Sequence, residues 1–335
     1  MRRIFALSLL FAFVAAPALA GPNIPTGTKL TKGMTLVYRV FAGERTVFKD
    51  IYKPVDLPDY TFVHVTCAVT EAKGQADRFK VRCSDGAPDL FIADSAAFWH
   101  EGSTYGWTDK GLTRFGEGGP EVILPKAMKA QKAAGFVGQM MPLMGTKKRV
   151  QCRETQDNDG PGDPPDFAVC ASLHYGITFV DATSVAGAGS FVKIELVDAF
   201  STAAASDSAK RHKLVKKAQK FIVTWLHVQN KRNFKAYGEL YSDKYKGVKR
   251  AGPKTRFFQK TNWLKDRAKM FKTAMKVQAR DVGYTYTGEK IYVAFRQTWE
   301  TKKWKDTGPK ELVLKIEPTG LRAISEEMVE SFRMK

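Results

Sequence analysis

The sequence is poor in cysteine, with four in 335 residues and no CxxC pair. Four cysteines are too few for a small disulfide-dense scaffold, and the five histidines do not cluster near them, so we expect no metal site and no cofactor. After residue 20, no apolar run approaches the roughly 20 residues that a membrane-spanning helix needs. Apolar material itself is plentiful, at 44% hydrophobic residues with 22 Phe, which excludes a largely disordered chain.

The first 20 residues have the pattern of a secretory signal peptide. Two arginines follow the initial methionine, an apolar run covers 4–16, and Ala-Leu-Ala at 18–20 is a small-residue cleavage site. Gly21 rather than a cysteine then begins the mature chain, which disfavours a lipid-anchored protein. We therefore predict cleavage after Ala20 and a periplasmic or secreted protein in an oxidising compartment.

The cysteines flank two polar, turn-rich segments. Cys67 and Cys83 enclose a link between two strand-like runs, and Cys152 and Cys170 enclose a loop rich in Asp, Gly and Pro. Four cysteines allow three pairings. The local pairing, Cys67–Cys83 with Cys152–Cys170, would close two loops of about 15 residues and stabilise the fold by about 3 kcal/mol each. Calcium would suit the acidic second loop, but the ligand spacing fails after Gly160, so we expect a solvated loop.

Charge divides the mature chain into two unlike halves. Residues 21–205 hold 20 Lys and Arg against 21 Asp and Glu, whereas residues 206–335 hold 32 against 13, for net charges of −1 and +19. A small-residue stretch over 201–209 separates them and is typical of a linker or of the lead-in to a helix. We predict a signal peptide over 1–20, a disulfide-containing β-rich domain over 21–205 (the first half) and a basic domain over 206–335 (the second half).

The first half has the pattern of antiparallel β-structure and resembles no family that we recognise. Strand-like alternation of β-branched and aromatic residues occurs at 34–41, 60–69, 78–84 and 191–198. Two shorter runs over 98–115 surround a turn predicted at Gly106. These patterns predict a meandering sheet folded as a barrel, a half-barrel or a sandwich.

The second half predicts an α+β order of three helices followed by four strands. Apolar residues keep helical spacing over 207–230, 233–245 and 253–272. Strand patterns follow at 275–283, 290–300, 310–317 and 320–327, with turns expected at Gly288-Glu289, Gly308-Pro309 and Thr319-Gly320. Antiparallel strands with the helices laid on one face are the simplest packing of this order.

Landmark residues of the second half are spread over about 215–330: Trp225, Phe234, Tyr237, Tyr241, Trp263, Arg267, the run Phe295–Trp299, Lys310, Gly320, Glu326 and Glu327. Their order resembles the nuclear transport factor 2-like (SnoaL-like) superfamily, and most closely the domain appended to bacterial periplasmic transpeptidase-type proteins. The resemblance implies a cone of three helices and a curved four-stranded antiparallel sheet around an internal pocket, used for catalysis, binding or dimer formation. The transpeptidase itself needs an activated cysteine, and the cysteines here fit disulfides instead.

Within such a cone we expect a pocket formed by Trp225, Tyr237, Tyr241, Trp263, Arg267, Gln297 and Trp299. Alternation along 290–300 places Gln297 on the same face as its apolar neighbours. With Trp263 and Arg267 it would form a polar anchor for a ligand, or it would simply satisfy buried hydrogen bonds of the fold. Enzymes of this fold use a carboxylate base and an acid or phenol. Asp281 fits a turn and His227 a helix edge better, so we name no catalytic residue.

A net charge of +19 attracts polyanions at long range. Candidate contact residues are the lysines of the first helix and of one turn: Lys213, Lys216, Lys217, Lys220, Lys302, Lys303 and Lys305. Because export removes the protein from nucleic acid, the expected partners are an anionic envelope polymer, lipid headgroups through peripheral membrane contact, or an envelope protein. The sheet of the second half would also serve for dimer formation, and solubility alone is the other explanation of the charge.

Three functions follow, in order of preference. The first is an exported, non-catalytic envelope protein that binds an anionic component or a protein partner through its basic domain. The alternative is a periplasmic carrier of a lipid or small hydrophobic ligand. In that case the Met-rich segment 126–149 would gate the ligand rather than pack as a helix across the sheet. The third is a SnoaL-like pocket enzyme.

Overall fold

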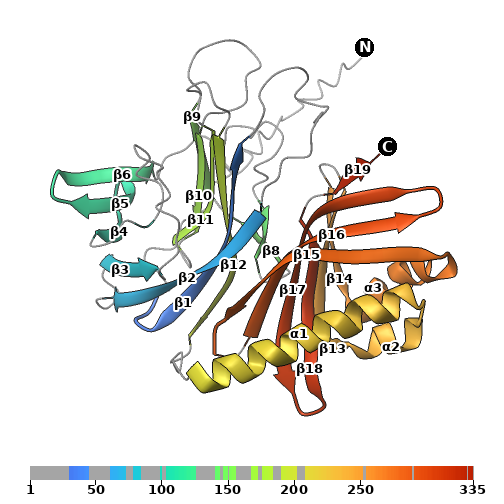
Figure 1. Cartoon of the computed structure of the whole chain (residues 1–335). Helices are drawn as coiled ribbons and strands as arrows, with labels where there is room; N and C mark the ends of the chain where they lie inside the picture. The colour runs from blue at the N-terminus through green and yellow to red at the C-terminus, as the bar shows by residue number, and fades with distance from the viewer. Residues whose placement is uncertain are drawn as a thin grey trace, which may run out of the picture.

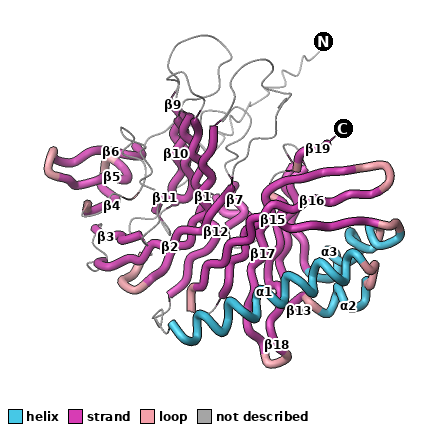
Figure 2. Tube along the Cα trace, in the orientation of Figure 1, coloured by secondary structure: helices cyan, strands magenta, loops and turns pink. Residues whose placement is uncertain are grey.

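The computed structural model describes residues 30–44, 61–72, 78–83, 99, 103–125, 140–143, 146–149, 151–155, 167–172, 176–183, 190–201, 208–251, 254–288, 290–329 and 331–334 (Figure 1). The predicted signal peptide over 1–20 and the acidic loop over 156–166 lie outside them. Strands dominate, and the described helices all belong to the second half (Figure 2). The described fold is α+β with mostly antiparallel sheets, and none of its helices is long and apolar enough to cross a membrane.

Ten of the twelve described strands of the first half form one antiparallel sheet. Their bounds are β1 (Met34–Glu44), β2 (Thr61–Ala72), β3 (Arg78–Cys83), β4 (Thr104–Thr108), β5 (Gly111–Gly116), β6 (Gly119–Pro125), β9 (Gln151–Thr155), β10 (Phe167–Ser172), β11 (Gly176–Thr183) and β12 (Ser190–Ser201). The order is β6-β5-β4-β3-β2-β1-β12-β11-β10-β9, so the described sheet is open and not a closed barrel. The turn predicted at Gly106 is wrong, because Gly106 is buried inside β4 and the turn follows at 109–110.

A hairpin stands where the Met-rich segment was expected to pack as a helix or act as a gate. Its strands are β7 (Met140–Leu143) and β8 (Thr146–Arg149), and β7 lies against β12. Runs of four residues are too short for a helix and suit paired strands. Residues 126–139 of that segment lie outside the described residues.

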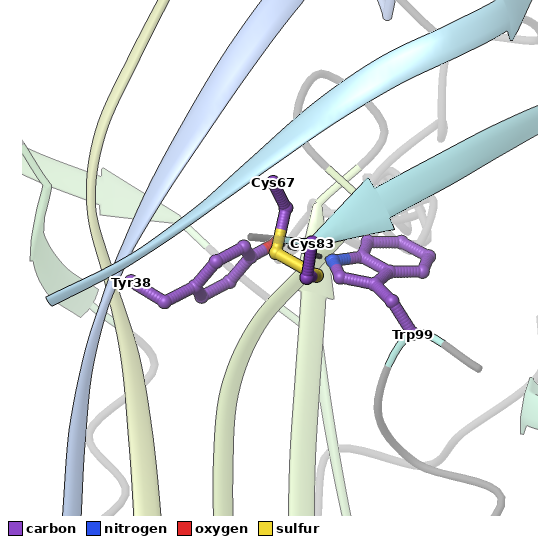
Figure 3. The surroundings of a disulfide bond; sticks show 4 residues. All are labelled: Tyr38, Cys67, Cys83 and Trp99. Atoms are coloured by element: carbon purple, nitrogen blue, oxygen red, sulfur yellow. Dashed lines mark hydrogen bonds between the residues drawn. A yellow bond between two sulfur atoms is a disulfide. The ribbon is translucent and has the colours of Figure 1, made fainter. Parts of the chain in front are cut away.

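The first predicted disulfide is confirmed. Cys67 and Cys83 are directly opposite in the β2–β3 ladder and are bonded through their sulfur atoms. Figure 3 shows this bond beside Tyr38 and Trp99, and the Trp99 indole nitrogen donates a 2.7 Å hydrogen bond to the Tyr38 hydroxyl. Cys152 and Cys170 face each other in the β9–β10 ladder, and their disulfide stays a prediction.

The second half places its helices on one face of a mostly antiparallel sheet. The elements are α1 (Ser208–Asn230), α2 (Phe234–Glu239), β13 (Tyr241–Ala251), β14 (Lys254–Gln259), α3 (Lys260–Ala268), η1 (Met270–Lys272), β15 (Met275–Tyr286), β16 (Lys290–Thr301), β17 (Lys305–Glu317), β18 (Gly320–Met328) and β19 (Phe332–Met334). The sheet runs β14-β13-β18-β17-β16-β15, with β19 beside β17. Figure 1 shows α1 running along this sheet. The apolar stripe of α1, which includes Phe221 and Trp225, is buried against one face of this sheet, which we call the inner face.

Seven described strands replace the four that were predicted for this sheet. Residues 241–245, expected to end the second helix, begin β13, and residues 254–259, expected to begin the third helix, form β14. Tyr241 and Tyr245 are four residues apart, so they satisfy both the helical period and the period of two. Parallel pairing of β13 with β18, which lies far away in sequence, decides in favour of the strand.

The turn predicted at Gly308-Pro309 is also wrong. Both residues lie inside β17, and the chain turns at 302–304 instead. On one side of β17, β19 pairs with residues 305–307 and β18 begins to pair only at Lys310. Pro309 therefore lies between the segment of β17 that pairs with β19 and the segment that pairs with β18. No described strand needs a backbone N–H from that position, so proline, which has none, is tolerated there.

The two sheets pack against each other. β2 lies against β15 and β16, and Val37 and Val197 of the first half form a buried cluster with Tyr292 and Val313 of the second. Tyr292 alternates with Ile291 and Val293, which face the helices, so the first half covers the sheet face opposite to the helices. We expected a dimer through this sheet without naming a face, and the first half occupies part of this one.

Candidate functional site

A buried polar cluster lies between the helices and the inner face of the seven-stranded sheet of the second half. Glu326 of β18 is 2% exposed and forms an ion pair with Lys310 of β17, which is also 2% exposed. The Tyr241 hydroxyl donates to Glu326, and the Trp225 indole nitrogen donates to the Tyr241 oxygen at 2.9 Å. Tyr237 donates to the same carboxylate at 3.5 Å. We call these five residues the interior cluster.

The interior cluster holds an ionised carboxylate, and each of its two oxygens accepts at least one hydrogen bond. Burial alone would raise the pKa of Glu326, but Lys310 and Arg267 outweigh it and hold that pKa below its ordinary value. Burial, followed by the negative charge of Glu326, raises the pKa of Tyr241 well above its ordinary value. A carboxylate stabilised in this way is a poor proton acceptor. The arrangement therefore favours a structural anion over a catalytic base.

Beside this cluster, three buried donors have no hydrogen-bond partner in the described part of the chain. They are the Tyr245 hydroxyl, the Trp263 indole nitrogen and Nε of Arg267, whose guanidinium lies 3.9 Å from the ring centre of Trp263. The packing is tight, because a Cβ atom on Gly247 would lie 2.8 Å from Trp263 and 2.5 Å from the Tyr245 oxygen. A buried water is the usual way to satisfy such groups.

The predicted pocket residues thus divide into two groups. The structure gathers Trp225, Tyr237, Tyr241, Trp263 and Arg267 around Glu326. Gln297 is buried in β16, and no hydrogen bond among the described residues joins it to Trp263 or Arg267. Trp299 is half-buried and donates to the Met275 sulfur at 3.3 Å. Glu326 and Lys310 were recognised as landmarks of the sequence, but their pairing across β17 and β18 was not foreseen.

A second ionic cluster joins the two halves and was not predicted. Arg39 of β1 is 1% exposed and bonds both oxygens of Glu311 at 3.2 Å and one oxygen of Glu327 at 2.8 Å. The other residues of this interface cluster are Glu195, Arg250 and His64. Glu311 and Glu327 are directly opposite each other in the β17–β18 ladder. Like charges at such positions repel, so a cation between them is required.

The charges of the interface cluster fix one another. Burial alone would lower the pKa of Arg39. The negative charges of Glu311, Glu327 and Glu195 raise that pKa by more than burial lowers it, so the guanidinium stays charged. Burial would raise the pKa of Glu311, yet Arg39 and His64 hold it below its ordinary value. One sequence signal pointed to this interface: Tyr292 and Val313 are apolar on the face of the sheet away from the helices, which indicates burial on both faces.

The predicted basic residues fall in two separate places. Lys213, Lys216, Lys217 and Lys220 are exposed on the N-terminal half of α1, and we call these four the basic face of α1. Lys302 and Lys303 are exposed in the β16–β17 turn, while Lys305 lies 3.9 Å from Glu300. This turn is next to Met275 of β15, near the C-terminal end of α1, where Asn230 bonds Val277. At 1.5 Å per residue, about 20 Å of helix separates Lys217 from that end.

Comparison with known proteins gives fold similarity only. No family model and no curated protein matches the chain. Bd1075 of Bdellovibrio bacteriovorus is 17% identical with a TM-score of 0.32, over 42% of this chain and 48% of its own. An NTF2-like protein of unknown function from Pseudomonas putida is 9% identical with a TM-score of 0.31, over 36% of this chain and 86% of its own. The helical cell shape determining protein Pgp2 from Campylobacter jejuni is 16% identical with a TM-score of 0.27, over 32% of this chain and 37% of its own.

The chain is weakly similar to NTF2-like proteins over part of its length. It spans about half the length of the Bdellovibrio protein, at 48% of that chain.

Proposed function

We propose that this is an exported, non-catalytic cell-envelope protein that binds an anionic envelope component through its basic second half. In this proposal, the second half is a cone like the domain appended to periplasmic transpeptidase-type proteins, with the β13–β14 hairpin added to it. The basic face of α1 is the contact surface. The observation that carries the proposal is the arrangement of charge on this helix.

The charge on α1 opposes the stability of the helix itself. Residues 208–230 contain no Asp or Glu, and the four lysines of the basic face form four pairs that are three or four residues apart. Like charges at this spacing destabilise a helix by about 0.2–0.5 kcal/mol per pair. Arg211 also lies in the first helical turns, where the helix dipole favours negative charge. A helix whose charges oppose its own stability is expected where the charges serve a function. Closely spaced anions of a ligand would offset the repulsion between these lysines.

The absence of catalysis in this proposal rests on the interior cluster. Its carboxylate, Glu326, is buried and held by Lys310 and two tyrosine hydroxyls. This arrangement supports a rigid domain that binds through its surface.

The test is binding of the mature full-length chain to peptidoglycan, lipopolysaccharide and anionic vesicles across a salt series. The variant K213Q/K216Q/K217Q/K220Q removes the basic face of α1. Its matched control, K231Q/K235Q/K269Q/K272Q, removes the same charge from exposed lysines elsewhere in the second half. We expect retention by one fraction at about 0.15 M salt, where exposed charges are screened beyond about 8 Å, and loss of retention only in the first variant. Equal loss in both variants would show that the charge acts generically and would overturn the proposal.

A further inference from the structure

A cleft of about 630 Å³ lies between the two halves. It is found beside Arg39, Val197 and Asp198 of the first half and extends over β13, β16, β17 and β18, on the sheet face opposite to the helices. Its volume is within the range of about 300–1,000 Å³ that small-molecule sites occupy. None of its lining residues belongs to α1, so this site is separate from the surface proposed above.

The acidic residues that line the cleft are already bound to other side chains. Asp198 is bonded by Lys290 and Tyr292, and Glu311 and Glu327 are bonded by Arg39. Two further acids complete the lining: Asp243, 2.8 Å from the Lys260 ammonium, and Glu317, which accepts a 2.5 Å bond from the Ser242 hydroxyl.

Two lysines of the lining present unneutralised positive charge. Lys244 and Lys246 are exposed on β13, and no ion pair or hydrogen bond of their ammonium groups occurs within the described residues. Because they are two positions apart on a strand, their side chains project from the same face, with Cα atoms about 7 Å apart. The cleft therefore offers a pair of ammonium groups to an anion.

The cleft also has apolar walls. Val197, Tyr292 and Val313 are buried in its floor, and Ile324 packs against them while half-buried. Ile316, also part of the lining, is 45% exposed, one of the few large apolar side chains exposed to that degree among the described residues. An exposed isoleucine and two lysines without ion pairs in the lining of one cleft match a ligand that has both an acidic group and an apolar part.

We propose that this cleft binds an amphiphilic anion. Its acidic group would pair with Lys244 and Lys246, and its apolar part would cover Ile316 and Ile324. Association would exclude water from the apolar walls, and the two ammonium groups would select anions over neutral or cationic amphiphiles of equal length.

The test measures binding of dodecanoate and dodecyl phosphate, below their micelle concentrations, to the mature full-length chain by calorimetry. Acetate, inorganic phosphate and dodecyltrimethylammonium are the comparison probes. We expect one or both dodecyl anions to bind. The preferred headgroup then distinguishes a carboxylic acid from a phosphate ester. Equal binding of dodecyltrimethylammonium, or of acetate and phosphate, would overturn the proposal.

Two variants locate the site. K244Q/K246Q should weaken binding at least about fivefold, and the control K235Q/K272Q should change it by less than about twofold. I316S, at an exposed position where folding should be preserved, should also weaken binding of the dodecyl anions. Unchanged affinity in K244Q/K246Q would refute the site. The variant that lacks the basic face of α1 should bind these probes normally, so this inference and the proposed function can fail independently.

Discussion

Lys310 and Glu311 are neighbours in β17, and Glu326 and Glu327 are neighbours in β18, yet each pair is divided between the two faces of the sheet. On the face towards the helices, Lys310 and Glu326 neutralise each other within the second half. On the opposite face, Glu311 and Glu327 repel each other and share Arg39 of the first half, although Glu327 is also paired with Arg250 of the second half. The interior cluster is thus self-sufficient, whereas the interface cluster requires both halves.

This difference predicts that the two halves stabilise each other despite their unlike charge. A second half without Arg39 would retain two carboxylates directly opposite in a ladder, with Arg250 paired to Glu327 and no described arginine paired to Glu311. Its Tyr292 and Val313 would also lose the apolar cover of Val37 and Val197. A buried ion pair is in general weak support for stability, but removing one partner of such a pair is strongly destabilising.

The largest effect is therefore expected from Arg39→Met. It leaves Glu195, Glu311 and Glu327 buried with less positive charge, and we expect a loss of about 3–5 kcal/mol in unfolding free energy, measured with urea. Lys310→Met should cost a similar amount, because it leaves Glu326 buried without its cation.

Proteolysis separates these two variants. If the interface cluster holds the halves together, Arg39→Met should accelerate cleavage in the predicted linker over 201–209 under native conditions, and Lys310→Met should not. Equal cleavage of both would mean that the two clusters do not differ in the way argued above.

Acid should weaken both clusters. Glu311 and Glu326 have folded pKa values below the ordinary 4.5, so each contributes stability that is present above about pH 4.5 and is lost as pH falls through the folded value. Urea unfolding of the natural chain at pH 7, 4 and 3 should show that the unfolding free energy falls steeply as the pH is lowered. Glu311→Gln should be less stable at pH 7 and should lose less on acidification, because one titrating group is gone. If the unfolding free energy of Glu311→Gln fell with pH as steeply as that of the natural chain, Glu311 would not contribute to the acid sensitivity.

The sequence predicts local features of this protein better than distant pairings. The Cys67–Cys83 bond follows from two strand-like runs joined by a short polar link, and α1 follows from its apolar stripe. By contrast, Arg39 and Glu311 are 272 residues apart, and no local pattern connects them. β13 was missed for a related reason, since Tyr241 and Tyr245 fit two periods and only the parallel pairing with β18 decides between them. β14 then forms by pairing with β13.

The smallest expected effect has the opposite sign. Replacing the four lysines of the basic face of α1 with glutamine removes four like-charge pairs at i, i+3 or i, i+4, so unfolding free energy should rise by about 1–2 kcal/mol. The matched control K231Q/K235Q/K269Q/K272Q alters lysines spread over other elements, and its stability should change little. Urea unfolding at low salt measures both, and added salt should narrow the difference because it screens the repulsion. A gain in stability that accompanies a loss of envelope binding would show that α1 carries its charge for a ligand, whereas unchanged stability would remove the physical basis of the proposed contact surface.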